Sequence, residues 1–271
     1  MQVYCIISDE RVYRAKSTAI FSTVLKRMGI RGAYVPFKVA PDQVGQALQS
    51  LRILNIAGAN ITVPYKETVI PHLDILSEGA NIIGAINTIV VNDGQLKGYN
   101  TNAIGFMDAL SFAGFEAEDK SALVFGTGGA ARAVAFILNW QRTKTIFLTG
   151  RNEQKTNQMV KQFGGEARTF SSLEGQRLPV NIVVNATSVS STEESPEIAA
   201  LMASLDLPEC EMLVDLNYDR PNNFWEHAAQ DKGIRFMDGL MPLAYQARRT
   251  FALWTGIQVP PEEFISAIEE A

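Results

Sequence analysis

The stretch from Ala122 to Phe136, read as Ala-Leu-Val-Phe-Gly-Thr-Gly-Gly-Ala-Ala-Arg-Ala-Val-Ala-Phe, constrains the fold more than any other part of the chain. An apolar run ends at Gly126, glycines follow, and an alanine-rich segment with helical spacing begins. This order predicts a strand, a tight turn and a helix. Glycines let the backbone bend sharply and approach a phosphate without an obstructing Cβ. The free N–H groups of the first helical turn then point toward the anion.

The glycine pattern, G-x-G-G-A-x-x-A, departs from the strict G-x-G-x-x-G. Gly126 and Gly128 occupy the first two glycine positions, and Ala131 is the small residue that lets the helix pack on the strand. A lone glycine triplet also occurs in ordinary turns, but the strand before it and the helix after it favour a dinucleotide site. We therefore predict that the cofactor contacts Gly126, Gly128, Gly129 and Ala130.

The end of the next strand, 145–149, indicates which dinucleotide is bound. An NAD enzyme usually places Asp or Glu there to hold the ribose hydroxyls, about 20 residues after the glycines. This chain has Gly150 and Arg151 at that point, with Lys155 four residues after Arg151. A guanidinium binds a 2′-phosphate, which a carboxylate would repel. We predict NADP, with Arg151 and Lys155 in contact with it; the alternative is that both are solvated charges at a helix start.

Composition excludes several classes of protein. The chain has 271 residues and a formal net charge of −5, without a basic cluster, so we expect no nucleic-acid partner. It shows no signal peptide and no apolar run long enough to span a bilayer, so we expect a cytoplasmic protein with no membrane partner. Its two cysteines and two histidines are far apart in the sequence. They predict no disulfide framework, no metal site and no histidine base.

The first part of the chain alternates strands with helices, which predicts a parallel or mixed α/β sheet. Apolar runs predict strands at 3–7, 32–39 and 58–63, and Asp93-Gly94 predicts a hairpin between strands at 87–92 and 95–99. Helical spacing predicts helices at 16–28, 41–51 and 103–112, and a helical segment from Tyr65 that Pro71 interrupts.

After the glycine turn, we predict a helix that ends near Phe163 and strands at 180–185 and 212–215. Ser171-Ser-Leu-Glu174 is typical of a capping box that begins a short helix. A polar loop is expected at 188–196, a helix near 224–230, and two final helices at 241–255 and 261–270.

Several fragments together resemble the shikimate dehydrogenase family, in the family's order and over nearly the whole chain. Besides the glycine turn, they are Asn60-Ile-Thr-Val-Pro-Tyr-Lys66, Gly84-Ala-Ile-Asn-Thr88, Gly98-Tyr-Asn-Thr-Asn102, Asn185-Ala-Thr-Ser188 and Asp238-Gly-Leu-Met-Pro-Leu-Ala-Tyr-Gln246. The resemblance implies a substrate-binding catalytic α/β domain of residues 1–102 and 238–271, to which the C-terminal helices return. It also implies an NADP-binding Rossmann domain of residues 103–237.

The resemblance also implies roles for particular residues. Lys66 matches the family's catalytic lysine, and its ammonium suits the alkoxide that hydride transfer to a ketone leaves. Ser17, Thr62, Asn87, Tyr218 and Gln246 match substrate-binding residues, whose hydroxyls and amides suit a polyhydroxylated ring. Thr187 and Gly239 are assigned to cofactor binding by the motifs that contain them. Each substrate-binding polar residue has an alternative role as a capped turn or a core polar group.

Two departures from the family pattern concern catalysis and substrate binding. Asn102 replaces the aspartate that pairs with the lysine in the family; it hydrogen-bonds but carries no charge and cannot act as a base. In the first loop the family has H-S-x-S-P, whose two serines bind a carboxylate, and this chain has Arg14-Ala15-Lys16-Ser17-Thr18. Ser17 matches the second serine, whereas Ala15 replaces the first.

We expect an NADP-dependent oxidoreductase that interconverts 3-dehydroshikimate, or a related cyclic hydroxy acid, and shikimate by hydride transfer. The alternative is a diverged paralogue with weak or no turnover that binds nucleotide or ligand. The retained Lys66, Thr62, Asn87 and Gln246 favour a working pocket, and the lost carboxylate favours slow chemistry. A monomer or a homodimer is expected.

Overall fold

The computed structural model describes residues 1–270. The chain divides into two compact units. The N-terminal unit contains residues 1–105 and the segment that begins at Leu243, and the central unit contains residues 106–242. The chain leaves the N-terminal unit within helix α4 (Thr101–Phe112) and returns to it within helix α10 (Leu240–Thr255).

The N-terminal unit is built on a mixed six-stranded sheet in the order β2-β1-β3-β5-β6-β4. Strand β1 pairs in parallel with β2 and β3, whereas β3–β5 and β5–β6 are antiparallel and β4–β6 is parallel. The strands are β1 (Gln2–Ser8), β2 (Gly32–Lys38), β3 (Gly58–Ile61), β4 (Ile75–Leu76), β5 (Thr88–Asn92) and β6 (Gln95–Tyr99). The expectation of a parallel or mixed sheet is confirmed.

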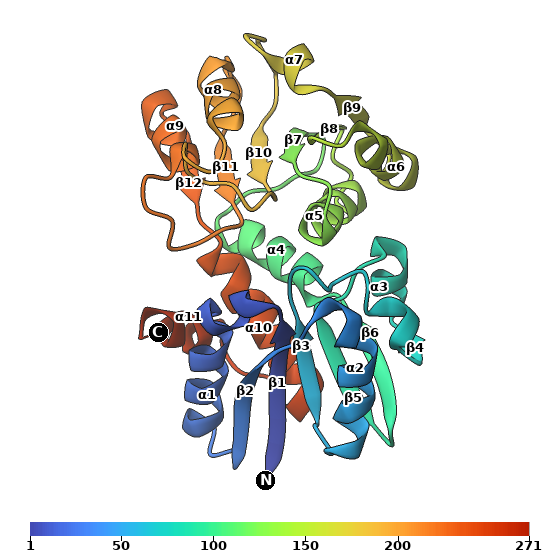
Figure 1. Ribbon diagram of the computed structural model, residues 1–271. Coiled ribbons are helices and arrows are strands. Elements are labelled where there is room, and N and C mark those ends of the chain that lie inside the picture. The colour runs from blue at the N-terminus through green and yellow to red at the C-terminus, as the bar shows by residue number, and fades with distance from the viewer. Residues whose placement is uncertain (271) are drawn as a thin grey trace. The chain divides into compact units, whose positions relative to one another are not determined.

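Helices cover both faces of this sheet, and Figure 1 shows α2 and α10 on opposite faces. On one face, Leu48 and Leu51 of α2 pack against Cys5 and Ile7 of β1. On the other, the Trp254 ring of α10 stacks on Tyr4 with centroids 4.7 Å apart. The helices of this unit, apart from α10, are α1 (Ser17–Arg27), α2 (Val44–Ile53), α3 (Glu78–Ile83) and α11 (Pro261–Glu269), with 3₁₀ turns at Glu10–Arg14, Pro41–Gln43 and Ile70–His72.

The central unit has a six-stranded sheet in which every pair is parallel, in the order β12-β11-β10-β7-β8-β9. This is the order of the dinucleotide-binding doubly wound fold, in which ligands bind where the strand order reverses, here between β7 and β10. The strands are β7 (Ser121–Phe125), β8 (Thr145–Thr149), β9 (Glu166–Arg168), β10 (Ile182–Asn185), β11 (Met212–Asp215) and β12 (Arg235–Met237).

Both faces of this parallel sheet are buried, as parallel sheets require. Val124 and Phe125 are adjacent in β7, so their side chains point to opposite faces, and neither is exposed. Trp225 packs edge-on against Phe125 with centroids 4.9 Å apart, and its indole N–H donates to the Val189 carbonyl at 2.9 Å. The helices that begin in this unit are α5 (Gly129–Trp140), α6 (Glu153–Phe163), α7 (Phe170–Leu173), α8 (Pro196–Ser204) and α9 (Phe224–Lys232).

Two local predictions are wrong, and one helix was not predicted. Residues 64–69 form turns instead of a helix, since Pro64 and Pro71 leave too few residues for capped helical turns. The short helix near Ser171 begins at Phe170, and its cap is Thr169, whose hydroxyl accepts from the Ser172 N–H at 3.2 Å. Glu174 lies at its C-terminal end, so there is no capping box. The polar segment before Pro196 leads into the unpredicted helix α8.

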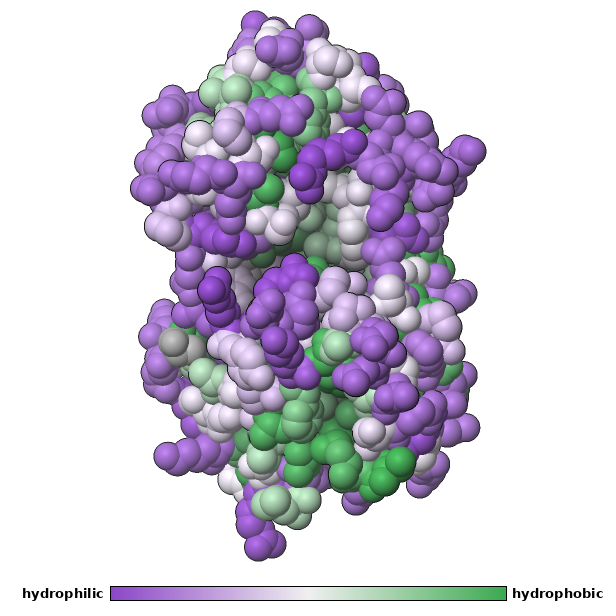
Figure 2. Space-filling model, viewed as in Figure 1, coloured by the Kyte–Doolittle hydropathy of each residue, from purple (hydrophilic) through white to green (hydrophobic). Residues whose placement is uncertain are grey.

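Most of the surface visible in Figure 2 is hydrophilic. Apolar surface gathers in the lower part of the N-terminal unit in this view. Among the exposed apolar residues of this unit are Ile53 and Leu54, at the C-terminal end of α2, which are 83% and 64% exposed. Within residues 1–270, no helix has the length and apolar character needed to cross a membrane.

Candidate active site

Lys66 lies in a loop after β3 that is tied to three neighbouring segments. The Thr62 N–H donates to the Ile7 carbonyl at 3.2 Å, and the Lys66 carbonyl accepts from the Ile86 N–H at 2.8 Å. The Tyr65 hydroxyl donates to the Val39 carbonyl at 2.6 Å. These bonds hold the loop at the carboxyl end of β1 and β3, the edge at which open α/β sheets place their ligands.

The Lys66 amine has no protein partner within residues 1–270: no hydrogen bond or ion pair reaches it. Burial disfavours its charged form and lowers the pKa of Lys66 to about 8. The Asn102 side chain is also without a hydrogen bond in the described chain; its backbone N–H donates to Asn87 Oδ1 at 3.3 Å. No carboxylate therefore offsets the cost of burying the Lys66 ammonium.

Asn87 and Gln246 contact each other. Asn87 Nδ2 donates to Gln246 Oε1 at 2.9 Å and to Thr101 Oγ1 at 2.8 Å. Asn87 Oδ1 accepts from the N–H groups of Thr101 and Asn102, so protein atoms fill all four of its hydrogen-bonding positions. Binding a substrate through Asn87 therefore requires one of these bonds to be exchanged. The NH₂ of Gln246, by contrast, has no partner within residues 1–270.

The first turn of α1 carries the two hydroxyls of the diverged loop. Ser17 is 8% exposed, and its hydroxyl has no hydrogen bond within the described residues. The buried Thr18 Oγ1 also lacks a partner there. Arg14 is exposed at the end of a 3₁₀ turn, and Ala15 follows it. The unpaired hydroxyls at this helix N-terminus are suited to an anionic group.

The glycine turn has the geometry that a dinucleotide requires. Gly126 has φ +117°, and a Cβ there would lie 2.8 Å from the Ala186 carbonyl oxygen. Beside Gly128, which caps α5, a Cβ would meet nothing within 4 Å. The first bond of α5 within this turn runs from the Arg132 N–H to the Gly128 carbonyl at 3.0 Å, which leaves the N–H groups of Gly129 and Ala130 for an anion. These residues fit a pyrophosphate.

Arg151 follows β8 and is exposed, as is Lys155 in the first turn of α6. Within residues 1–270 neither side chain forms an ion pair, so both charges are available to a phosphate. Asn152 caps α6 by accepting from the Lys155 N–H at 2.9 Å. No carboxylate occupies the end of β8, in agreement with the sequence.

Thr187 and Gly239 have structural explanations besides cofactor binding. Thr187 Oγ1 donates to Asn185 Oδ1 at 2.7 Å and accepts from the Val189 N–H at 3.1 Å, which closes a tight turn after β10. A Cβ at Gly239 would lie 2.3 Å from the Leu216 carbonyl oxygen. Glycine is therefore required at 239 by backbone packing alone.

Asp215, at the end of β11, is hydrogen-bonded to two loops: the one that contains Thr187 and the one that contains Tyr218. It is fully buried and accepts bonds of 2.7 to 3.0 Å from Asn185, Ser190, Asn217 and Asn223. Burial raises the pKa of Asp215, and these hydrogen bonds oppose the rise. Sequence reasoning missed this residue, although it lies only three positions before Tyr218.

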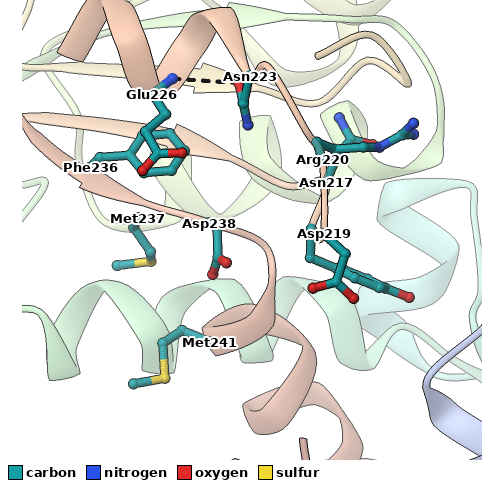
Figure 3. A pocket seen from close by; sticks show the side chains of 10 residues that line it. Asn217, Asp219, Arg220, Asn223, Glu226, Phe236, Met237, Asp238 and Met241 are labelled. Carbon is teal, nitrogen blue, oxygen red and sulfur yellow. Dashed lines mark hydrogen bonds between the residues drawn. The ribbon is translucent and has the colours of Figure 1, made fainter. Parts of the chain in front are cut away.

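Tyr218 lines a pocket of about 490 Å³ within the central unit (Figure 3). Asp219, Glu226 and Asp238 also line it, and the Arg220 guanidinium is paired with Glu194 at 2.9 Å. Burial, reinforced by neighbouring carboxylates, raises the pKa of Asp238. Because this lining contains three carboxylates, the pocket is not suited to a phosphate. Residues 1–270 contain no cluster of three or more potential metal ligands.

Comparison with known protein families matches two models in succession. Residues 7–89 match the shikimate dehydrogenase substrate binding domain, and residues 109–236 match the shikimate / quinate 5-dehydrogenase model. The chain belongs to the shikimate dehydrogenase family. The curated shikimate dehydrogenase (NADP(+)) of Desulforamulus reducens is 38% identical over 90% of this chain and 87% of its own length. The shikimate dehydrogenase (NADP(+)) of Halothermothrix orenii is 37% identical over 94% of this chain and 91% of its own length.

Solved shikimate dehydrogenases share the fold. The Thermus thermophilus shikimate 5-dehydrogenase, solved in complex with NADP(H) and shikimate, is 31% identical, with a TM-score of 0.87 over 100% of this chain and 99% of that one. The Aquifex aeolicus shikimate dehydrogenase is 31% identical, with a TM-score of 0.88 over 99% and 97%. The predicted fold, an N-terminal substrate domain with a Rossmann NADP domain, is confirmed.

Proposed function

We propose that this chain is an NADP-dependent oxidoreductase that interconverts shikimate and 3-dehydroshikimate by hydride transfer. The names of its relatives support this activity, and the solved Thermus relative holds both ligands. The observation that carries the proposal is the amine of Lys66, which has no hydrogen-bond or ion-pair partner among the described residues and whose pKa burial lowers to about 8. Ser17 and the NH₂ of Gln246, in the same unit, supply further unpaired donors.

NADP at the glycine turn would supply or accept the hydride. Lys66 supplies or accepts the proton: as an ammonium it donates to the oxygen of a reduced ketone, and as an amine it accepts from a hydroxyl that is being oxidised. A proton-transfer group works best with a pKa near the operating pH, and burial brings Lys66 there. The Gln246 NH₂ donates to substrate oxygens, and the Ser17 hydroxyl donates to a carboxylate.

The missing carboxylate beside Lys66 favours slow chemistry. The same observation also supports the alternative, a binding module with weak or no turnover. An amide at Asn102 can accept a hydrogen bond from a neighbouring donor, but it carries no charge and takes no proton. We therefore infer a working but slow enzyme. The two curated relatives described above are named as dehydrogenases, which supports turnover over binding alone.

The test is to mix the chain with NADP and shikimate and follow the absorbance of the reduced cofactor. We expect measurable reduction that Lys66→Ala abolishes. The matched control is Lys26→Ala, which removes an exposed lysine of the same unit and should leave the rate unchanged. Binding of both ligands without any cofactor reduction would favour the binding-module alternative.

We also propose a cytoplasmic location and a monomeric or homodimeric state. Cell fractionation with an antibody against the chain, and light scattering of the purified protein, test these two expectations. A membrane-pelleted fraction or a larger assembly would contradict them.

A further inference from the structure

A line of hydrogen-bonded polar side chains crosses the core of the N-terminal unit. It begins at Tyr34, whose hydroxyl donates to Asn60 Oδ1 at 2.8 Å, and continues as Asn60 Nδ2 donates to Thr88 Oγ1 at 3.3 Å. The Thr88 and Thr250 hydroxyls are 2.9 Å apart, as are those of Thr250 and Thr101. The line ends where the Thr101 hydroxyl reaches Gln246 Oε1 at 3.2 Å. The three threonines are at most 4% exposed.

The bonding groups at the two ends fix a direction for the protons. A carbonyl oxygen only accepts, so the Thr101 hydroxyl donates to Gln246 Oε1. Thr101 Oγ1 then accepts from Asn87 Nδ2 at 2.8 Å and from the Thr250 hydroxyl. Thr88 accepts from Asn60, and its hydroxyl oxygen lies 2.9 Å from that of Thr250 and 3.2 Å from that of Thr101, so it can donate to either. Each hydroxyl thus donates once, toward Gln246, and successive bonds polarise one another.

This direction determines which end of the Gln246 amide is free. Asn87 Oδ1 accepts two backbone N–H groups, so Asn87 must present its NH₂ to Gln246. A flipped Gln246 would place its own NH₂ against that of Asn87, so the hydrogen bond between the two amides would be lost. Gln246 Oε1 is therefore held by two donors, and its NH₂ is the group left for a ligand.

We propose that Thr101, backed by Thr250 and Thr88, is a positioning residue that fixes Gln246 as a hydrogen-bond donor to the oxygen atoms of a hydroxylated ligand. Shikimate as that ligand rests on the proposed function. Thr101 does not itself contact the ligand. Its hydroxyl acts through the Gln246 amide. With the NH₂ of that amide directed to the ligand, Gln246 favours ligand oxygens that accept a hydrogen bond over groups that only donate one.

The test compares three variants with the unmodified chain by calorimetric titration with shikimate and, separately, with NADP. Thr101→Val removes the hydroxyl at nearly constant volume, and we expect shikimate binding about three- to tenfold weaker, the loss typical of one hydrogen bond. NADP binding should not change. Thr101→Ser restores the hydroxyl and should restore the affinity. Tyr34→Phe is the matched control: it removes a hydroxyl from the far end of the same line and should lower Tm without weakening shikimate binding.

Equal shikimate affinity in Thr101→Val and the unmodified chain would overturn the inference, as would an equal loss in Tyr34→Phe or a failed rescue by serine. A measurement without ligand distinguishes failure of the inference about Thr101 from failure of the proposed function. We expect one sharp pair of Gln246 side-chain amide NMR signals in the unmodified chain and in Tyr34→Phe, and broadened signals in Thr101→Val. Identical signals in all three would overturn the inference even if shikimate does not bind.

Discussion

Lys66 is the residue on which the chemistry of the candidate site depends, and its surroundings set its affinity for protons. Burial without a carboxylate partner lowers its pKa to about 8. Its place in a recognised motif was readable from the sequence, and so was the missing charge at Asn102. That protein atoms occupy every hydrogen-bonding position of the Asn87 side chain could not be read from the sequence. One of those bonds is to Gln246, which lies 159 positions away and contacts Asn87 only in the folded chain.

The rate of shikimate oxidation should depend on pH through Lys66. Oxidation needs the neutral amine, which accepts a proton, so the rate should rise with pH and level off above about 8. Reduction needs the ammonium and should decline over the same range. In Asn102→Asp the carboxylate favours the ammonium, so the midpoint should move upward by about 1–3 pH units. Steady-state rates of oxidation and reduction, measured from pH 6 to 10, roughly two units on either side of this pKa, test the prediction. Superimposable pH–rate profiles of the unmodified chain and Asn102→Asp would contradict it.

Arg151 should determine the choice between NADP and NAD. If its guanidinium holds the 2′-phosphate, NADP binds more tightly by about 1–3 kcal/mol, the value of charge-assisted contacts. Arg151→Ala should shrink this difference and leave NAD binding nearly unchanged. Lys161→Ala, which removes a charge from the last turn of α6, is the control. Fluorescence titration of the three proteins with NADP and with NAD measures all six affinities. Equal binding of NADP and NAD by the unmodified chain would remove the basis for the assignment.

At the scale of elements, strands and long helices were predictable, whereas short connections were not. β11 and β6 lie where alternation and apolar runs place them, and α6 ends at Phe163 as expected. α8 was missed although Ser195 caps it and Pro196 opens it, since the segment before it is polar. The loop of Lys66 is set by long-range bonds such as that from Tyr65 to Val39, which local spacing does not contain.

Two glycines of the central unit, Gly128 and Gly239, should respond differently to substitution by alanine. At Gly239 a Cβ would lie 2.3 Å from a backbone oxygen, so Gly239→Ala should destabilise the fold by about 1–3 kcal/mol, the cost of overpacking. At Gly128 the space is open, and Gly128→Ala should leave stability nearly unchanged while weakening NADP binding. Urea unfolding and cofactor titration test the pair. An equally small change of stability in both variants would contradict this prediction, because it would mean that the backbone around Gly239 shifts easily to admit a Cβ.

The diverged loop before α1 should limit the affinity for shikimate. Ala15 lacks a hydroxyl donor, which is worth about 0.5–1.5 kcal/mol and up to about 3 with a charged partner. Ala15→Ser should therefore tighten binding, and Ser17→Ala should weaken it. Calorimetry with shikimate measures both changes. Tighter binding by the unmodified chain than by Ala15→Ser would mean that the loop is aligned wrongly with the family.

At the scale of the whole molecule, the division into two units was anticipated from the order of motifs. The resemblance placed the boundaries after residues 102 and 237, whereas the compact units meet after residues 105 and 242. Both junctions lie inside continuous helices, α4 and α10, where the sequence carries no linker signal such as a Gly- or Pro-rich tract. Helical periodicity runs on through the change of unit, which explains why the boundaries could not be read from the pattern.

The central claim is that Lys66 acts as the proton-transfer group and that Asn102 limits it. An aspartate at 102 would orient the amine and also take a proton, and proton transfer by a positioned group is worth about 10²–10⁴ in rate. The decisive measurement is steady-state shikimate oxidation at saturating NADP by three proteins: the unmodified chain, Asn102→Asp, and Asn102→Asp with Lys66→Ala. We predict slow turnover by the unmodified chain and turnover at least about tenfold faster by Asn102→Asp. The double variant should lose that gain, and the affinity for NADP should be the same in all three proteins. Rapid turnover by the unmodified chain that the aspartate does not alter would contradict the claim.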